Sequence, residues 1–275
     1  MLAGFVGLER LRNRVSDPGQ MAGLTLPVLG TLPNLGPGRP APTARGPDWA
    51  VAVEAIDTVR TMLLHAVGPS GPQVVLVSSP APAEGKTTLS GFLAESLVRG
   101  GYRTLLIDGD LRRPTAHSRY RTPTGPGVAE ILRGEETAVL ACCYRVEELG
   151  LWVLPAGRDS AAASELLPKG GWQWLVQQAR EAFDVVVVDS APLLAVVDPL
   201  VMAQACDGVV LAVMRDVSRI HLLADAANRL RTLDIPILGC VVHRAYRPPT
   251  GGYYYYANRP APGRHRPPAP PPAAG

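Results

Sequence analysis

The chain has few aromatic residues, only four cysteines and no long apolar run. None of the cysteines forms a Cys-x-x-Cys pair, so no zinc or iron–sulfur site is indicated, and we expect reduced thiols in a cytosolic protein. The apolar start at residues 1–8 is too short to span a bilayer and lacks the basic residues of a secretory signal. The formal charge of +3 gives no argument for nucleic acid, which we do not expect as a partner.

Proline, by contrast, is abundant, and its 28 residues concentrate towards the two ends of the chain. This distribution predicts a folded middle between disordered, Pro/Gly-rich flanks, because such flanks cannot bury enough apolar surface to fold. We predict an N-terminal segment and linker at 1–49, a folded domain at 50–246 and a disordered tail at 247–275.

Short apolar runs alternate with helical patterns through the middle of the chain. Strands are expected at 74–78, 104–108, 151–154, 185–189, 208–213 and 237–242, and helices at 51–65, 89–99, 172–182 and 220–233. Strands that are apolar on both faces and alternate with helices favour a mostly parallel sheet. The predicted fold class is therefore α/β, with a doubly wound sheet and helices on both of its faces.

The strand at 74–78 leads into a loop of small residues that is typical of phosphate binding. The loop closes on Gly85, Lys86, Thr87 and Thr88, and a helix follows. In such a loop the backbone N–H groups and the helix N-terminus face an anion, and the lysine reaches the terminal phosphates. Pro80 replaces the first glycine of the usual pattern. The loop alone therefore does not establish nucleotide binding, and further motifs in the chain are needed.

Two other strands end in aspartate. Asp108, followed by Asp110, ends the strand at 104–108, and Asp189 ends the strand at 185–189. The carboxyl ends of parallel strands meet at one edge of the sheet, where Lys86 and Thr87 are also expected. Mg²⁺ on a nucleotide takes hard oxygen ligands, and the lysine neutralises phosphate charge. Either aspartate alone would fit a loop cap, but both with Lys86 predict an ATP and Mg²⁺ site.

Three segments together resemble the Walker motifs of the bacterial tyrosine kinases, the P-loop kinases of capsule and exopolysaccharide synthesis. The segments are 79–88, 108–114 and 189–192, and the second has the discriminating pattern Asp-x-Asp-x-Arg-x-Pro. The likeness covers about residues 50–246. It implies a P-loop NTPase fold and an ATP-dependent protein-tyrosine kinase that regulates exopolysaccharide or capsule synthesis or export.

The resemblance also implies the residues of the site. The implied catalytic residues are Lys86, Asp108, Asp110, Arg112 and Asp189; the nucleotide-binding residues are Ala83, Glu84, Gly85, Lys86, Thr87, Thr88 and Arg244; and the metal ligands are Thr87, Asp108 and Asp189. Lys86 would hold the β- and γ-phosphates, and Asp108 would act as base or orienter for the tyrosine hydroxyl. Arg112 and Arg113 would neutralise transferred charge.

Three positions in and beside the motifs depart from the family pattern. Ala83 replaces a loop glycine, which restricts the backbone, and Ala191 replaces the first proline of the third motif. His243 stands where the family often has an asparagine near the adenine, and Arg244 after it would stack on the base. None of these departures removes a charged catalytic group.

Family members carry a C-terminal tyrosine cluster that is phosphorylated between neighbours in a ring. The implied phosphoacceptors here are Tyr253, Tyr254, Tyr255 and Tyr256. The family's subunit-contact motif, E-x-x-R-x-x-R, is matched by Glu54 and Arg60, but Asp57 replaces the middle arginine. The resemblance therefore implies a homo-oligomeric ring. The negative charge of Asp57, in place of an arginine, argues against that assembly.

Residues 8–33 resemble the segment after the second membrane helix of polysaccharide chain-length regulators fused to such kinases, and residues 27–33 match its P-V-L-G-x-[IL]-P motif. The resemblance implies a membrane chain-length regulator or co-polymerase as partner, either in trans or as a missing N-terminal part. It also implies a tyrosine phosphatase as a partner, and a cytoplasmic location at the inner face of the membrane.

Two other functions stay open from the residues alone. One is a Walker-type ATPase switch of the division-site or plasmid-partitioning kind. Those proteins have a signature lysine at the position of Ala81, so its absence here argues against this function. The other is a non-catalytic, ATP-binding regulator of a membrane co-polymerase, which Asp57, Ala83 and Ala191 favour.

Overall fold

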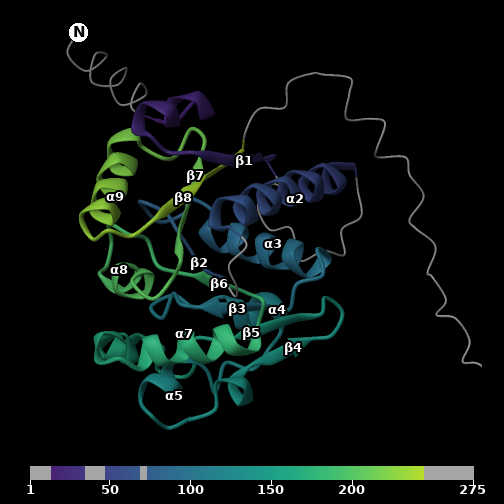
Figure 1. Ribbon diagram of the computed structural model, residues 1–275, viewed down its shortest axis with the longest axis vertical. Helices are drawn as coiled ribbons and strands as arrows, with labels where there is room; N and C mark the ends of the chain where they lie inside the picture. Colours follow the sequence, from purple (N-terminus) through teal and green to yellow (C-terminus); the bar gives the residue numbers. More distant parts are fainter. Residues whose placement is uncertain (1–13, 35–46, 69–72, 245–275) are drawn as a thin grey trace, which may run out of the picture.

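The computed structural model describes residues 14–34, 47–68 and 73–244. These residues form an eight-stranded sheet with helices packed against it (Figure 1). The tyrosine cluster at 253–256 lies outside the described residues. Among the described helices, none combines the length and the apolar character that a membrane crossing requires.

The strands follow the order β1-β8-β7-β2-β6-β3-β5-β4 across the sheet. They are β1 (Val28–Leu32), β2 (Gln73–Ser78), β3 (Thr104–Asp108), β4 (Tyr144–Val146), β5 (Leu151–Leu154), β6 (Val185–Asp189), β7 (Gly208–Met214) and β8 (Ile237–His243). Every neighbouring pair is parallel except β4 with β5. The predicted α/β sheet is confirmed. The three residues of β4 were too few to give a pattern.

Helices cover both faces of the sheet, as predicted. They are α2 (Pro47–Val67), α3 (Lys86–Arg99), α4 (Ala116–Tyr120), α5 (Val128–Leu132), α6 (Ser160–Ala163), α7 (Gly171–Ala182), α8 (Asp198–Ala203) and α9 (Ile220–Thr232), with 3-10 helices η1 (Pro18–Leu24), η2 (Val139–Cys142) and η3 (Ser164–Lys169). Val75 and Val77 of β2 join the apolar cluster under α2 and α3, whereas Val74 and Leu76 join the one under α7 and α9. This alternation explains why the strand is apolar at every position.

Part of the N-terminal segment belongs to the folded unit. We predicted residues 1–49 as a separate segment, and the structure adds residues 14–34 to the sheet and its core. β1 lies parallel to β8, and Cys240 N–H donates to Pro27 O at 2.7 Å. A Cβ on Gly30 would lie 2.6 Å from Val59 Cγ2, so this glycine lets α2 approach the strand. Gly30 and Thr31 interrupt the apolar pattern of this strand and prolines flank it, so the sequence alone did not predict it.

Candidate active site

The phosphate-binding loop lies between β2 and α3, at the carboxyl edge of the parallel strands. Gly85 precedes α3 with φ of +89°, a conformation that glycine adopts without strain. The helix therefore begins at Lys86, and its first N–H groups are left for an anion. Lys86 is buried, while Thr87 and Thr88 are partly exposed. The predicted loop thus has the backbone geometry that phosphate binding needs.

Glu84 braces this loop from inside. Its carboxylate accepts a hydrogen bond from Ala81 N–H at 2.7 Å, and its side chain is buried. Burial raises the pKa of Glu84, while hydrogen bonds from Ala81 N–H and from the Ser218 and Ser79 hydroxyls oppose that rise. These contacts give the Glu84 side chain a role in closing the loop. Its predicted contact with nucleotide stays a prediction.

The departure at Ala83 has a visible backbone consequence. Ala83 has φ of +64°, in the left-handed region that favours glycine. A non-glycine residue there costs on the order of 1 kcal/mol, because its Cβ lies close to the backbone carbonyl oxygen. The loop therefore holds strain at a position that the family pattern fills with glycine.

Asp108 and Asp189 meet at the ends of adjacent strands. β3 and β6 are in register, so the two residues are direct partners, and both side chains are buried. Asp108 Oδ2 accepts hydrogen bonds from the N–H groups of Thr115 and Ala116, at 2.9 and 2.8 Å. Asp108 Oδ1 is buried and has no hydrogen-bond partner among the described residues. Ser90 Oγ lies 3.0 Å from Asp189 Oδ1.

Burial makes both carboxylates hard to ionise. It raises the pKa of Asp108 to about 6 and that of Asp189 to about 7. The Thr87 and Ser90 hydroxyls and the charge of Lys86 oppose the rise at Asp189, whereas the charge of Asp108 adds to it. A nearby cation would reverse this effect, because it favours the ionised form.

The donor set fits Mg²⁺. Asp108 offers an unpartnered buried oxygen, and the Asp189 carboxylate and the Thr87 hydroxyl are also hard oxygen donors. Within residues 14–34, 47–68 and 73–244, no three His, Cys, Asp or Glu side chains gather as a metal site. Phosphate oxygens would therefore have to complete the coordination of such an ion.

The Asp-x-Asp-x-Arg segment divides its charged groups between two locations. Asp110 is partly buried and close enough to Lys86 for that charge to act on its pKa, which burial raises overall. Arg112 instead forms two hydrogen bonds with the buried carboxylate of Asp198, at 2.8 and 3.2 Å. Arg113 is exposed. The Arg112 guanidinium thus anchors α8, and its predicted part in neutralising transferred charge stays a prediction.

His243 lies against the phosphate loop. A Cβ on Gly85 would be 3.1 Å from His243 Nε2, so a larger residue at position 85 would push the ring away by a few tenths of an ångström. Nε2 is buried and has no partner among the described residues. Burial and the nearby charge of Arg244 lower the pKa of His243 to about 4. The sequence marks His243 as a departure from the family pattern, but its contact with Gly85 is visible only in the structure. Arg244 is exposed, and its predicted stacking on the base stays a prediction.

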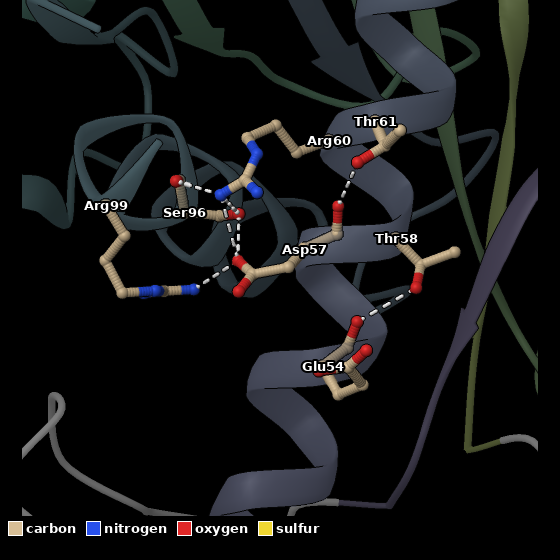
Figure 2. Close-up of polar contacts among 7 residues, drawn as sticks. All are labelled: Glu54, Asp57, Thr58, Arg60, Thr61, Ser96 and Arg99. Atoms are coloured by element: carbon tan, nitrogen blue, oxygen red, sulfur yellow. Dashed lines mark hydrogen bonds and ion pairs between the residues drawn. The ribbon is translucent and has the colours of Figure 1, made fainter. Parts of the chain in front are cut away.

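Asp57 joins α2 to α3 within the chain (Figure 2). Its Oδ1 accepts hydrogen bonds from Arg60 Nη1 at 3.2 Å, Ser96 Oγ at 2.5 Å and Arg99 Nη2 at 2.8 Å. Arg60 Nη1 also donates to Ser96 O at 2.6 Å. Glu54 is exposed, and its backbone carbonyl accepts from the Thr58 hydroxyl. Arg60, the arginine that matches the subunit-contact motif, is thus hydrogen-bonded within its own chain. Nothing in the sequence indicated this network.

Known proteins with similar sequences are tyrosine kinases, although no family model matches the chain. The tyrosine-protein kinase ptk of Acinetobacter johnsonii is 32% identical over 203 residues, which are 73% of this chain and 27% of that protein. The tyrosine-protein kinase YwqD of Bacillus subtilis is 29% identical over 206 residues, which are 75% of this chain and 86% of that protein. The chain thus spans about a quarter of the longer relative.

The structure of this chain is similar to the solved kinase domain of VpsO. It is 32% identical, with a TM-score of 0.62, and the match covers 70% of this chain and 94% of that domain. A match over nearly a whole solved domain, at this identity, concerns both fold and sequence. A kinase fold is consistent with the position of the phosphate loop and of the two strand-end aspartates at one edge of the sheet. The chain belongs to the bacterial tyrosine kinase family.

Proposed function

We propose that this chain is an ATP- and Mg²⁺-dependent protein-tyrosine kinase that phosphorylates its own tyrosine cluster, Tyr253, Tyr254, Tyr255 and Tyr256. The observation that carries the proposal is the unpartnered, buried Oδ1 of Asp108 beside Asp189, at the end of the sheet that holds the phosphate loop. Phosphoryl transfer needs positioning and charge stabilisation more than covalent help from the protein, and this edge offers both.

Each charged group has a distinct part in the transfer. Lys86 and the first N–H groups of α3 bind the phosphates of ATP. Thr87 and Asp189 would hold Mg²⁺, which neutralises phosphate charge when bound, and Asp108 Oδ1 is then left to accept a proton. The tyrosine oxygen forms its bond to the γ-phosphorus as the bond to ADP breaks, and Asp108 accepts the hydroxyl proton. A pKa of about 6 suits a base that works near neutral pH.

We further propose that the kinase regulates exopolysaccharide or capsule synthesis or export together with a membrane chain-length regulator, at the inner face of the membrane. Membership of the kinase family and the likeness of residues 27–33 to the juxtamembrane segment of such regulators support this proposal. Membership of the kinase family also leads us to propose a tyrosine phosphatase that reverses the modification.

The test uses the full chain with γ-labelled ATP and Mg²⁺, and follows phosphotyrosine. We expect label in the wild type, little label in Lys86→Met or Asp108→Asn, and none in a variant with residues 253–256 changed to phenylalanine. Lys169→Met is a matched control, because Lys169 is the other lysine of the chain and is exposed. Its label should equal that of the wild type.

The outcomes separate the rival functions. Phosphotyrosine that persists in Lys86→Met would contradict the proposal. ATP hydrolysis without phosphotyrosine would identify a switch ATPase, and nucleotide binding without either reaction would identify a non-catalytic regulator. Label that appears only after a chain-length regulator fragment is added would assign activation to that partner.

A further inference from the structure

Helix α4 holds one oxygen of Asp108. It follows directly after the Asp-x-Asp-x-Arg segment, and the N–H groups of Thr115 and Ala116 donate to Asp108 Oδ2 at 2.9 and 2.8 Å. Two donors on Oδ2 fix the rotation of the carboxylate and leave Oδ1 as its unpartnered oxygen. The orientation of Asp108 therefore depends on where α4 begins.

Helix α4 cannot hold that position by itself. It contains five residues, and a helix of that length is unstable without packing, because nucleation is unfavourable. Its last residue, Tyr120, donates from its hydroxyl to Glu95 Oε1 on α3, at 3.0 Å. Arg119 Nη2 lies 3.3 Å from the same oxygen. Tyr120 and Glu95 are both buried, so this hydrogen bond is shielded from water.

The surface of α3 is shaped to accept α4. A Cβ on Gly91 would lie 2.7 Å from the Tyr120 hydroxyl oxygen and 2.8 Å from Arg119 Cζ. The absence of a side chain at Gly91 thus lets both residues reach Glu95, one helical turn further along. The Arg119 guanidinium also lies over the ring of Phe92, 5.2 Å from its centre. The same helix carries Lys86 at its first position.

We propose that Tyr120 and Glu95 are positioning residues, which fix α4 on α3 and thereby direct Asp108 Oδ1 into the site. Their hydrogen bond connects the helix that starts at Lys86 to the helix that holds Asp108. It sets these two groups relative to one another before any ligand binds. Its consequence for catalysis rests on the proposed kinase function, whereas its consequence for the geometry of Asp108 does not.

The test is Tyr120→Phe in the full chain, which keeps the ring and removes only the hydroxyl. Amide hydrogen exchange measured by NMR should become about five- to tenfold faster at Thr115 and Ala116, the effect of losing one buried hydrogen bond, with amides of the central strands unchanged. In the kinase assay we expect kcat to fall by a similar factor, with KM for ATP within twofold. Tyr102→Phe is the matched control, because Tyr102 is exposed.

Substitutions at Glu95 complete the test. Glu95→Gln keeps an acceptor oxygen and should retain most of the wild-type protection at Thr115 and Ala116, whereas Glu95→Leu should lose it. Unchanged exchange at both amides in Tyr120→Phe would overturn the proposal. So would faster exchange spread equally over all strands, because that result reports general destabilisation. If the exchange changes as expected while the wild type transfers no phosphate, the positioning role stands and the proposed function fails.

Discussion

Asp108 and Asp189 are direct partners across the parallel strands β3 and β6, and Gly109 N–H donates to Asp189 O at 2.7 Å. The two carboxylates are far apart in sequence and adjacent in space, with the phosphate loop on the neighbouring strand β2. Burial raises the pKa of both carboxyl groups, and the charge of Asp108 raises the pKa of Asp189 further. A cationic ligand at this edge would therefore be attracted by both carboxylates.

Replacement of Ala83 by glycine should stabilise the protein. Glycine removes the strain at φ of +64°, but it also makes the unfolded chain more flexible, so we expect a net gain of about 0.5 kcal/mol in the free energy of unfolding. Urea denaturation measures it. Ala81→Gly is the control, because Ala81 does not have positive φ and should lose stability. A loss in Ala83→Gly equal to that in the control would show that residue 83 is unstrained.

Arg112 and Arg113 should differ in their effect on stability. Arg112→Gln removes the guanidinium from the buried Asp198 carboxylate, and we expect a loss of about 2 kcal/mol, because an unpaired buried charge remains. Arg113 is exposed, so Arg113→Gln should change the free energy of unfolding by less than about 0.5 kcal/mol. Urea denaturation compares them. Equal effects would mean that Arg112 does not anchor Asp198.

The Asp57 network should contribute to the attachment of α2. Asp57→Ala removes an acceptor shared by Arg60, Ser96 and Arg99, all partly accessible to water except Ser96. We expect a loss of about 1 kcal/mol by thermal or urea unfolding, since exposed ion pairs contribute little and the Ser96 hydrogen bond contributes more. Glu54→Gln is the matched control on the same helix and should be neutral. A neutral Asp57→Ala would refute the attachment.

His243 should make the fold sensitive to acid. Its folded pKa of about 4 lies below the ordinary value of 6.5, so the unfolded chain binds a proton first as pH falls. The neutral His243 side chain makes its full contribution to the free energy of unfolding above pH 6.5. This contribution, about 3 kcal/mol, is lost as the pH falls from 6.5 to 4. His243→Gln should remove this part of the pH dependence.

Measurement of the free energy of unfolding at pH 7 and pH 4.5 checks the prediction for His243. Asp108 and Asp189 titrate in the wild type and in the variant alike, so the difference between the two proteins isolates the histidine. His65→Gln is the control, because His65 is exposed on α2. The same pH dependence in His243→Gln and the wild type would contradict the burial of a neutral imidazole.

The sequence by itself predicted which residues form the candidate site. A strand buried on both faces has to be apolar along its whole length, so Asp108 and Asp189 mark strand ends in the sequence. The carboxyl ends of parallel strands meet at one edge, so their neighbourhood with Lys86 also followed from the pattern. The tyrosine cluster was equally visible, although it lies outside the described residues.

Only the tertiary structure decided which partner each polar side chain takes. Tyr120 with Glu95, Arg112 with Asp198 and His243 with Gly85 are contacts between separate elements. Residues 28–32 became a strand only beside β8. Such contacts depend on how helices of given length pack on the sheet and on where a missing Cβ permits close approach. The apolar pattern of a helix or strand indicates which of its own residues are buried. A hydrogen bond between two elements depends on the positions of both, which no local pattern contains.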